Sequence, residues 1–247
     1  MDVISIVSIA IIGAVIGSLI GIIHKPTDIY INNFLAFAAG TMLAISFIQL
    51  IPQSIGLSSL WFCCGGIITG ALFMYGLDKL IPHTDPVDSH DIKSGRSLNK
   101  VAMYLIIGIA LHHFPEGMAI ALGAVAGYKV SLVIVLAIAI HDIPEGICTS
   151  APYFYVTKNR LKSFIISSTT AIPTVLGYLF ANFLFQHIPS QIIGFVIAST
   201  AGLMIYISAD ELIPTSCQKD LPTYSHSSIF SLIAGIVFFI ILGYISK

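Results

Sequence analysis

Two short stretches of the chain place histidine, proline and glutamate in the same order. Residues 112–117 read HHFPEG and residues 141–146 read HDIPEG. In each stretch a histidine lies four residues before a glutamate, so both side chains share one face of a helix. Imidazole and carboxylate without thiolate suit Zn²⁺, Fe²⁺ or Mn²⁺ better than Mg²⁺ or Ca²⁺, which prefer oxygen ligands only. The predicted metal ligands are His112, His113, Glu116, His141, Asp142 and Glu145.

The composition around these motifs indicates a membrane protein. Of 247 residues, 56% are hydrophobic and 9% are charged, whereas a soluble domain carries about 25% charged residues. This balance excludes an ordinary soluble domain, a disulfide-rich extracellular scaffold and a disordered chain. The net charge of −1 gives no basic field, so we expect no nucleic-acid partner. We expect a multi-pass protein of the cell membrane, in contact with the lipid bilayer.

Eight apolar stretches are long enough to cross a bilayer, for which a helix needs about 20 residues. They cover residues 3–23, 34–53, 60–81, 101–126, 130–154, 163–187, 191–213 and 228–246. The predicted fold class is therefore all-α and integral to the membrane, with residues 1–247 forming one transmembrane domain. The two motifs fall about halfway along the fourth and fifth stretches, and the longest connection is the polar loop 82–100.

The basic residues predict which side of the membrane each loop faces. With eight spans, both chain ends lie on the same side. If that side is outside the cytoplasm, nine of the 11 Lys and Arg residues belong to cytoplasmic loops or their borders, as the positive-inside rule requires. We therefore expect both termini outside the cytoplasm and the loop 82–100 inside it.

Every glutamate of the protein lies within an apolar stretch. These residues are Glu116, Glu145 and Glu211, and Asp142 and Asp210 lie in the same stretches. No Lys or Arg lies near the middle of any predicted span. A carboxylate at bilayer depth is costly unless it is protonated or paired with a cation. This charge of a single sign favours a cation-binding site within the membrane.

The sequence contains two internal repeats. Residues 39–54 and 201–216 are identical at nine of 16 positions, at an offset of 162. The two histidine motifs form the second repeat, at an offset of 29. Because the paired spans run in opposite directions, we expect a 3+2+3 bundle in which spans 1–3 repeat, inverted, as spans 6–8. Inverted repeats around a site near the midplane are typical of transporters.

In these motifs the chain resembles the ZIP family of zinc and iron permeases, in its short-loop bacterial branch. The resemblance covers nearly the whole chain and implies uptake of a divalent metal into the cytoplasm through the six ligands named above. Zn²⁺ is the expected substrate, with Fe²⁺, Mn²⁺, Co²⁺ or Cd²⁺ as alternatives, and no cofactor is expected. The resemblance further implies that the loop between spans 3 and 4 captures or senses arriving metal, and the candidates here are His83, Asp85, Asp88, His90 and Asp91.

Two departures from the family pattern affect accessory metal sites. Relatives with a two-metal site carry glutamate before the proline of span 6, where this chain has Ile172 before Pro173. We therefore expect one metal ion per transport site. In span 2 the relatives often carry a glutamate where this chain has Gln49, and an amide is a weaker ligand. The other candidates for accessory ligands or for an exit path are Gln53, Cys148, Asp210 and Glu211.

Three functions are compatible with acids and histidines inside apolar helices. Transport is favoured by the inverted repeats, and the chain has no P-loop for nucleotide binding. An intramembrane metal-dependent hydrolase is the alternative, although the HExxH pattern of zinc proteases is absent. A metal-binding protein without flux is the third. We expect a transporter and not an enzyme.

Gly13, Gly17 and Gly21 form a small-residue seam that suits helix packing within the bundle or in a homodimer.

Overall fold

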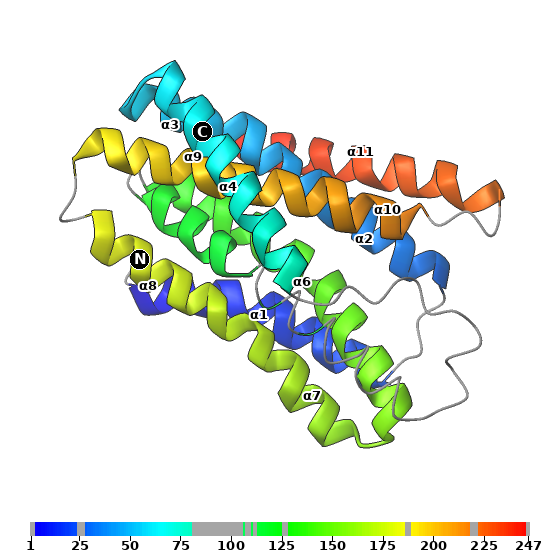
Figure 1. Ribbon diagram of the computed structural model, residues 1–247. Helices are drawn as coiled ribbons and strands as arrows, with labels where there is room; N and C mark the ends of the chain where they lie inside the picture. The colour runs from blue at the N-terminus through cyan, green and yellow to red at the C-terminus, as the bar shows by residue number, and fades with distance from the viewer. Residues whose placement is uncertain are drawn as a thin grey trace.

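The computed structural model describes residues 3–23, 28–80, 106, 110, 113–124, 128–185, 189–217 and 222–245. In this part of the chain every regular element is a helix (Figure 1). The elements are α1 (Val3–Ile23), α2 (Asp28–Ala44), η1 (Ile45–Leu50), α3 (Ile51–Leu57), α4 (Leu60–Leu80), α6 (Tyr128–Thr157), α7 (Arg160–Ser168), η3 (Thr169–Ala171), α8 (Ile172–Phe185), α9 (Ser190–Ile207), η4 (Ser208–Leu212), α10 (Ile213–Ser216) and α11 (Pro222–Ile245). Residues 113–124 form one more helix, called here the motif helix.

Six described segments are long and apolar enough to cross a membrane. They are Asn32–Leu57, Leu60–Leu77, Ser131–Ala151, Arg160–Phe183, Ser190–Ser216 and His226–Ile245, and Ser8–Ile23 is a shorter apolar helical segment. This agrees with the predicted all-helical membrane class. Of the predicted span 101–126, the structure describes residues 106, 110 and 113–124, and all of them are helical.

Large apolar side chains cover the outside of the bundle. Trp61 is 82% exposed, Phe183 is 68% exposed and Phe230 is 72% exposed. Soluble monomers rarely leave large apolar patches in water. A surface of this kind suits the acyl chains of lipid, and helices satisfy their own backbone hydrogen bonds there.

The helix α6 lies in the middle of the bundle. Figure 1 shows α2, α4, α9 and α11 on one side of α6, and α1, α7 and α8 on the other. Of the six apolar segments, the one in α6 is the most buried. Functional side chains on α6 are therefore shielded from lipid by helices on both sides.

Glycines allow the backbones of neighbouring helices to touch. Gly13 and Gly17 of α1 lie against the carbonyls of Ala139 and Ile143 in α6, where an added Cβ would come within 1.8 and 2.1 Å of the oxygens. Small residues at such crossings are the usual means of close helix packing in membranes. The seam predicted from these glycines therefore packs within the chain, against α6.

The glycine contacts follow the repeat found in the sequence. Gly40 of α2 faces the carbonyl of Leu232 in α11, and Gly202 of α9 faces the carbonyl of Ile67 in α4. Gly202 follows Gly40 by 162 residues, and Leu232 follows Ile67 by 165. Each of these two pairs joins a helix of one repeat to a helix of the other, and both pairs make the same close approach.

The same relation holds around the histidine motifs. Gly17 of α1 faces the carbonyl of Ile143 in α6, and Gly177 of α8 faces the carbonyl of Phe114 in the motif helix. Gly177 follows Gly17 by 160 residues, and Ile143 follows Phe114 by 29, which is the offset between the two motifs. The motif helix and α6 are thus packed in equivalent ways by α8 and α1.

Two π-helical segments, η1 and η4, occupy equivalent positions in the two repeats. In each, a serine hydroxyl donates to the carbonyl four residues before it: Ser46 to Met42 at 2.9 Å and Ser208 to Met204 at 2.8 Å. A proline lies two residues beyond the end of each segment. Serine bonds of this kind bend helices, and proline displaces the carbonyl four residues back. An extra residue in the turn accommodates both effects.

We expect Gly202→Ala to lower the stability of the bundle, because the new methyl group would meet the Ile67 carbonyl at 2.1 Å. Overpacking of this kind costs about 1–3 kcal/mol. Gly76→Ala is the matched control, since its Cβ would have no neighbour within 4 Å. Thermal unfolding in detergent measures the difference, and equal midpoints for the two variants would contradict the close approach.

Candidate metal centre

Five of the six predicted metal ligands lie together in the structure. His113 and Glu116 come from the motif helix, and His141, Asp142 and Glu145 come from α6. Each of these five residues is 0% exposed. The sixth predicted ligand, His112, lies outside the described residues.

The imidazole nitrogens face the carboxylates at short range. His141 Nε2 lies 3.0 Å from Glu116 Oε1 and 3.4 Å from Asp142 Oδ1. His113 Nε2 lies 3.3 Å from Glu145 Oε2 and 3.7 Å from Asp142 Oδ1. Around a tetrahedral zinc with bonds of about 2.0–2.1 Å, two ligand atoms are about 3.4 Å apart. The observed distances lie on both sides of this value, so the cluster has the dimensions of a zinc site.

The five side chains form two overlapping groups of possible ligands. One contains His113, Glu116 and Asp142, and the other contains Glu116, His141 and Glu145; within each group the ligand atoms lie within 4.8 Å of one another. Glu116 belongs to both groups. Its carboxylate is therefore the link between the motif helix and α6.

Backbone carbonyls fix the orientation of both imidazole rings. His113 Nδ1 lies 2.6 Å from the carbonyl of Thr170, and His141 Nδ1 lies 3.0 Å from the carbonyl of Ala137. A carbonyl only accepts a hydrogen bond, so each Nδ1 carries the proton and donates it. Each Nε2 is thereby directed at the carboxylates, the arrangement found for metal-binding histidines.

Several buried polar atoms of the cluster lack a hydrogen-bond donor or acceptor. Among the described residues, Glu116 Oε2, both carboxylate oxygens of Asp142 and His113 Nε2 have no hydrogen-bond partner. An unsatisfied buried group costs about 1–3 kcal/mol, and more when it is charged. A divalent cation bound at these atoms would satisfy them together, which is the main physical argument for a metal centre.

Three accessory candidates, Cys148, Asp210 and Glu211, belong to neither ligand group. Gln49 is half-buried in η1. Gln53 donates from Nε2 to the carbonyl of Leu122 at 2.9 Å, Cys148 lies in the hydrophobic core with a free thiol, and Asp210 is exposed. The candidates in the polar loop, His83, Asp85, Asp88, His90 and Asp91, lie outside the described residues.

The backbone contacts of the two histidines were not anticipated from the sequence. The carbonyls of Thr170 and Ala137 hold the histidines, and a backbone group leaves no signature of residue type. Ile172, at the position where the family pattern has glutamate, is 53% exposed and contributes no ligand. A proline after Ile172 is the one sequence signal of an irregular backbone near Thr170.

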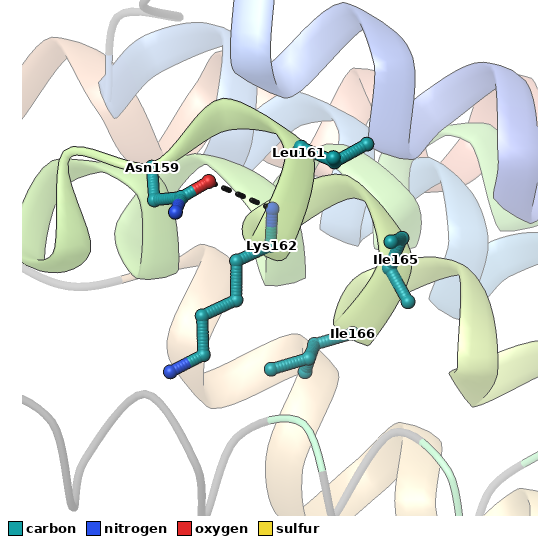
Figure 2. A pocket seen from close by; sticks show the side chains of 5 residues that line it. All are labelled: Asn159, Leu161, Lys162, Ile165 and Ile166. Carbon is teal, nitrogen blue, oxygen red and sulfur yellow. Dashed lines mark hydrogen bonds between the residues drawn. The ribbon is translucent and has the colours of Figure 1, made fainter.

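A surface hollow at the start of α7 differs from the metal centre in its chemistry. Figure 2 shows its lining residues, which are Asn159, Leu161, Lys162, Ile165 and Ile166. The Asn159 side chain accepts a hydrogen bond from the Lys162 backbone N–H at 3.0 Å and caps α7. Among the residues that the structure describes, the lining of the hollow has no histidine or carboxylate, so they offer no counterpart to the buried cluster.

We expect Glu116→Gln to weaken zinc binding about tenfold or more. Replacing a residue that only hydrogen-bonds to a metal ligand costs about 10–100-fold in affinity, and Glu116 belongs to both ligand groups. Competition with a zinc chelator of known affinity measures the effect. Asp78→Asn in α4 makes the same change of acid to amide at a position that belongs to neither motif. Unchanged zinc affinity in Glu116→Gln would contradict the assignment.

Comparison with known proteins agrees with these features. Residues 84–243 match the family model described as ZIP zinc transporter. Zinc transporter ZupT of Chlorobium phaeovibrioides is 35% identical over 240 residues, covering 89% of this chain and 88% of the relative. Zinc transporter ZupT of Lysinibacillus sphaericus is 32% identical over 242 residues, with coverage of 89% and 88%. Zinc transporter ZupT of Escherichia coli O127:H6 is 33% identical over 214 residues, with coverage of 83% and 82%. The chain therefore belongs to the ZIP family, and it is a multi-pass membrane transporter and not an enzyme.

Proposed function

We propose that this protein carries divalent transition metal ions, with Zn²⁺ first among them, into the cytoplasm through the buried cluster of the motif helix and α6. The observation that carries the proposal is the set of buried ligand atoms on Glu116, Asp142 and His113 that have no hydrogen-bond partner. The names of the relatives support zinc as the substrate. His112 completes the proposed ligand set from the adjacent position.

The proposed topology is a 3+2+3 bundle of eight spans with both termini outside the cytoplasm. The glycine contacts support it, because those of Gly17 and Gly40 have counterparts at Gly177 and Gly202. The distribution of Lys and Arg supports the orientation. In this arrangement the motif helix and α6 are the two central spans, and the ligands lie at the same depth on both.

The geometry suggests how an ion is held and released. Both Nε2 atoms are already directed at the carboxylates, so little reorganisation is needed when a metal ion replaces its water shell with these ligands. Metal and protons compete for imidazole and carboxylate. A proton taken up by the cluster therefore favours release of the metal, and the metal gradient or an exchange with protons can drive net movement. Exposed Asp210, with Glu211, supports an acidic exit path at η4.

The cluster is proposed to hold one metal ion. Ile172 supplies no bridging oxygen, and Asp142 Oδ1 lies within 3.7 Å of both imidazole Nε2 atoms, so the ligands surround a single centre. Elemental analysis of zinc-loaded, washed protein should give one tightly bound zinc per chain, lost in Glu116→Gln. Two zinc ions lost together in that variant would show a two-metal centre instead.

Zinc flux into vesicles tests the proposed function. Purified protein is reconstituted around a zinc-sensitive dye, and wild type is compared with the double variant Asp142→Asn, Glu145→Gln, which preserves shape but removes two carboxylates. We expect saturable zinc entry in wild type, loss of entry in the double variant and no change in Asp78→Asn. Because protons compete for the ligands, the KM for zinc should rise as the external pH falls.

Folded, zinc-binding wild-type protein that gives no flux under either direction of pH gradient would contradict transport. A double variant that carries zinc as fast as wild type would contradict the path through the cluster while leaving transport intact. The Asp78→Asn control separates both outcomes from general effects of removing an acid.

A further inference from the structure

The two histidines of the cluster are held in different ways. His141 donates to Ala137, four residues earlier in the same helix. His113 donates to Thr170, which belongs to η3 and is 57 residues away in sequence. The orientation of His141 is thus set within α6, whereas that of His113 depends on the position of a separate helical segment.

The backbone around Thr170 is arranged to leave its carbonyl accessible. The segment η3 is a 3-10 turn, in which Ile172 N–H donates to the carbonyl of Thr169, three residues back. The next donor in this pattern, the nitrogen of residue 173, would reach the carbonyl of Thr170. That residue is Pro173, which has no N–H. The 3-10 donor that would compete with His113 is therefore missing.

The other half of the repeat has no such arrangement. With the offset of 160 that relates α1 to α8, Pro173 corresponds to Gly13 and Thr170 to Ala10, both within the unbroken helix α1. With the offset of 29, His113 corresponds to Asp142. A carboxylate has no N–H to donate, so this half needs no free carbonyl. The 3-10 turn with proline is present only where a histidine uses it.

Buried hydroxyl groups tie this segment to the helix that carries the other ligands. Thr170 Oγ1 donates to the carbonyl of Ser167 at 2.7 Å. The hydroxyl of Ser167 accepts from Ser18 of α1 at 2.8 Å and is hydrogen-bonded to Thr149 of α6. Thr149 lies one turn after Glu145 and also bonds to the carbonyl of that residue, at 3.1 Å. The position of η3 is therefore fixed relative to the ligands of α6.

We propose that Pro173 and the Thr170 carbonyl position His113 for metal binding, with the Ser167–Thr149 contact as their anchor. This inference rests on the proposed function of the cluster. The carbonyl holds the Nδ1 proton and leaves Nε2 to the metal, as hydrogen-bond partners beyond the ligands do in other metal sites. Pro173 and Thr149 act through His113 and are positioning residues.

The variant Pro173→Ala tests the proposal. It introduces an N–H that can donate to the Thr170 carbonyl in competition with His113. We expect zinc affinity to fall about tenfold, within the 10–100-fold range for such partners, and the KM for zinc to rise with little change in maximal flux. With Co²⁺ as a spectroscopic probe, the visible absorption of the bound metal should change because one imidazole is misoriented. Pro214→Ala, the same substitution after η4, should leave the Co²⁺ spectrum and zinc affinity unchanged.

A second pair of variants covers the case in which Pro173→Ala does not fold. Thr149→Val keeps the shape but removes the hydroxyl, and Thr149→Ser keeps the hydroxyl. We expect Thr149→Val to lower zinc affinity and alter the Co²⁺ spectrum, and Thr149→Ser to restore both. A merely structural role would lower the unfolding temperature without changing the spectrum of the folded protein.

The outcomes separate this inference from the proposed function. Wild-type affinity and Co²⁺ spectrum in folded Pro173→Ala, or equal effects in Pro214→Ala, would overturn the positioning role. If Pro173→Ala does not fold, wild-type affinity and spectrum in Thr149→Val would overturn it. An altered Co²⁺ spectrum in Pro173→Ala, in a protein whose wild type carries no zinc, would support the positioning role while the transport function fails.

Discussion

The structure depends on one electrostatic constraint: three carboxylates and two imidazoles are buried together where neither water nor lipid can satisfy them. Glu116, Asp142 and Glu145 are 0% exposed, and their neighbours in the cluster are His113 and His141. Such a group is stable only when protons or a cation neutralise it. Its dimensions match a transition-metal site, so the feature that is costly in the empty protein is the one that we propose to bind the transported ion.

The bundle satisfies this constraint through symmetry and close packing. Glycines bring α1 against α6 and α8 against the motif helix at backbone contact, which leaves the facing sides of the two motif-bearing helices to the ligands. The repeat makes these two environments equivalent, but the ligands are not, since His113 stands where the other half has Asp142. The turn at Thr170, which is followed by Pro173, provides the free carbonyl that His113 uses and that Asp142 does not need.

Much of the fold could be predicted from the sequence because membrane-spanning helices consist of long runs of apolar residues. The predicted stretch 3–23 coincides with α1, and 60–81 with α4 (Leu60–Leu80), within one residue. The cluster was predictable in part, because the spacing of His141 and Glu145 places both side chains on one helix face. The irregular turns were not predicted: η1 arises from a serine and a proline acting together. The Thr170 contact depends on a backbone oxygen and on long-range packing, neither of which residue types reveal.

Locating bound zinc tests the central claim most directly. Crystals of the wild-type protein grown with zinc, measured at the zinc absorption edge, would give an anomalous peak at each bound ion. The account predicts a strong peak bonded to Glu116 and to the Nε2 atoms of His113 and His141, between the motif helix and α6. Peaks found only outside this cluster, at a zinc concentration that supports flux, would contradict it.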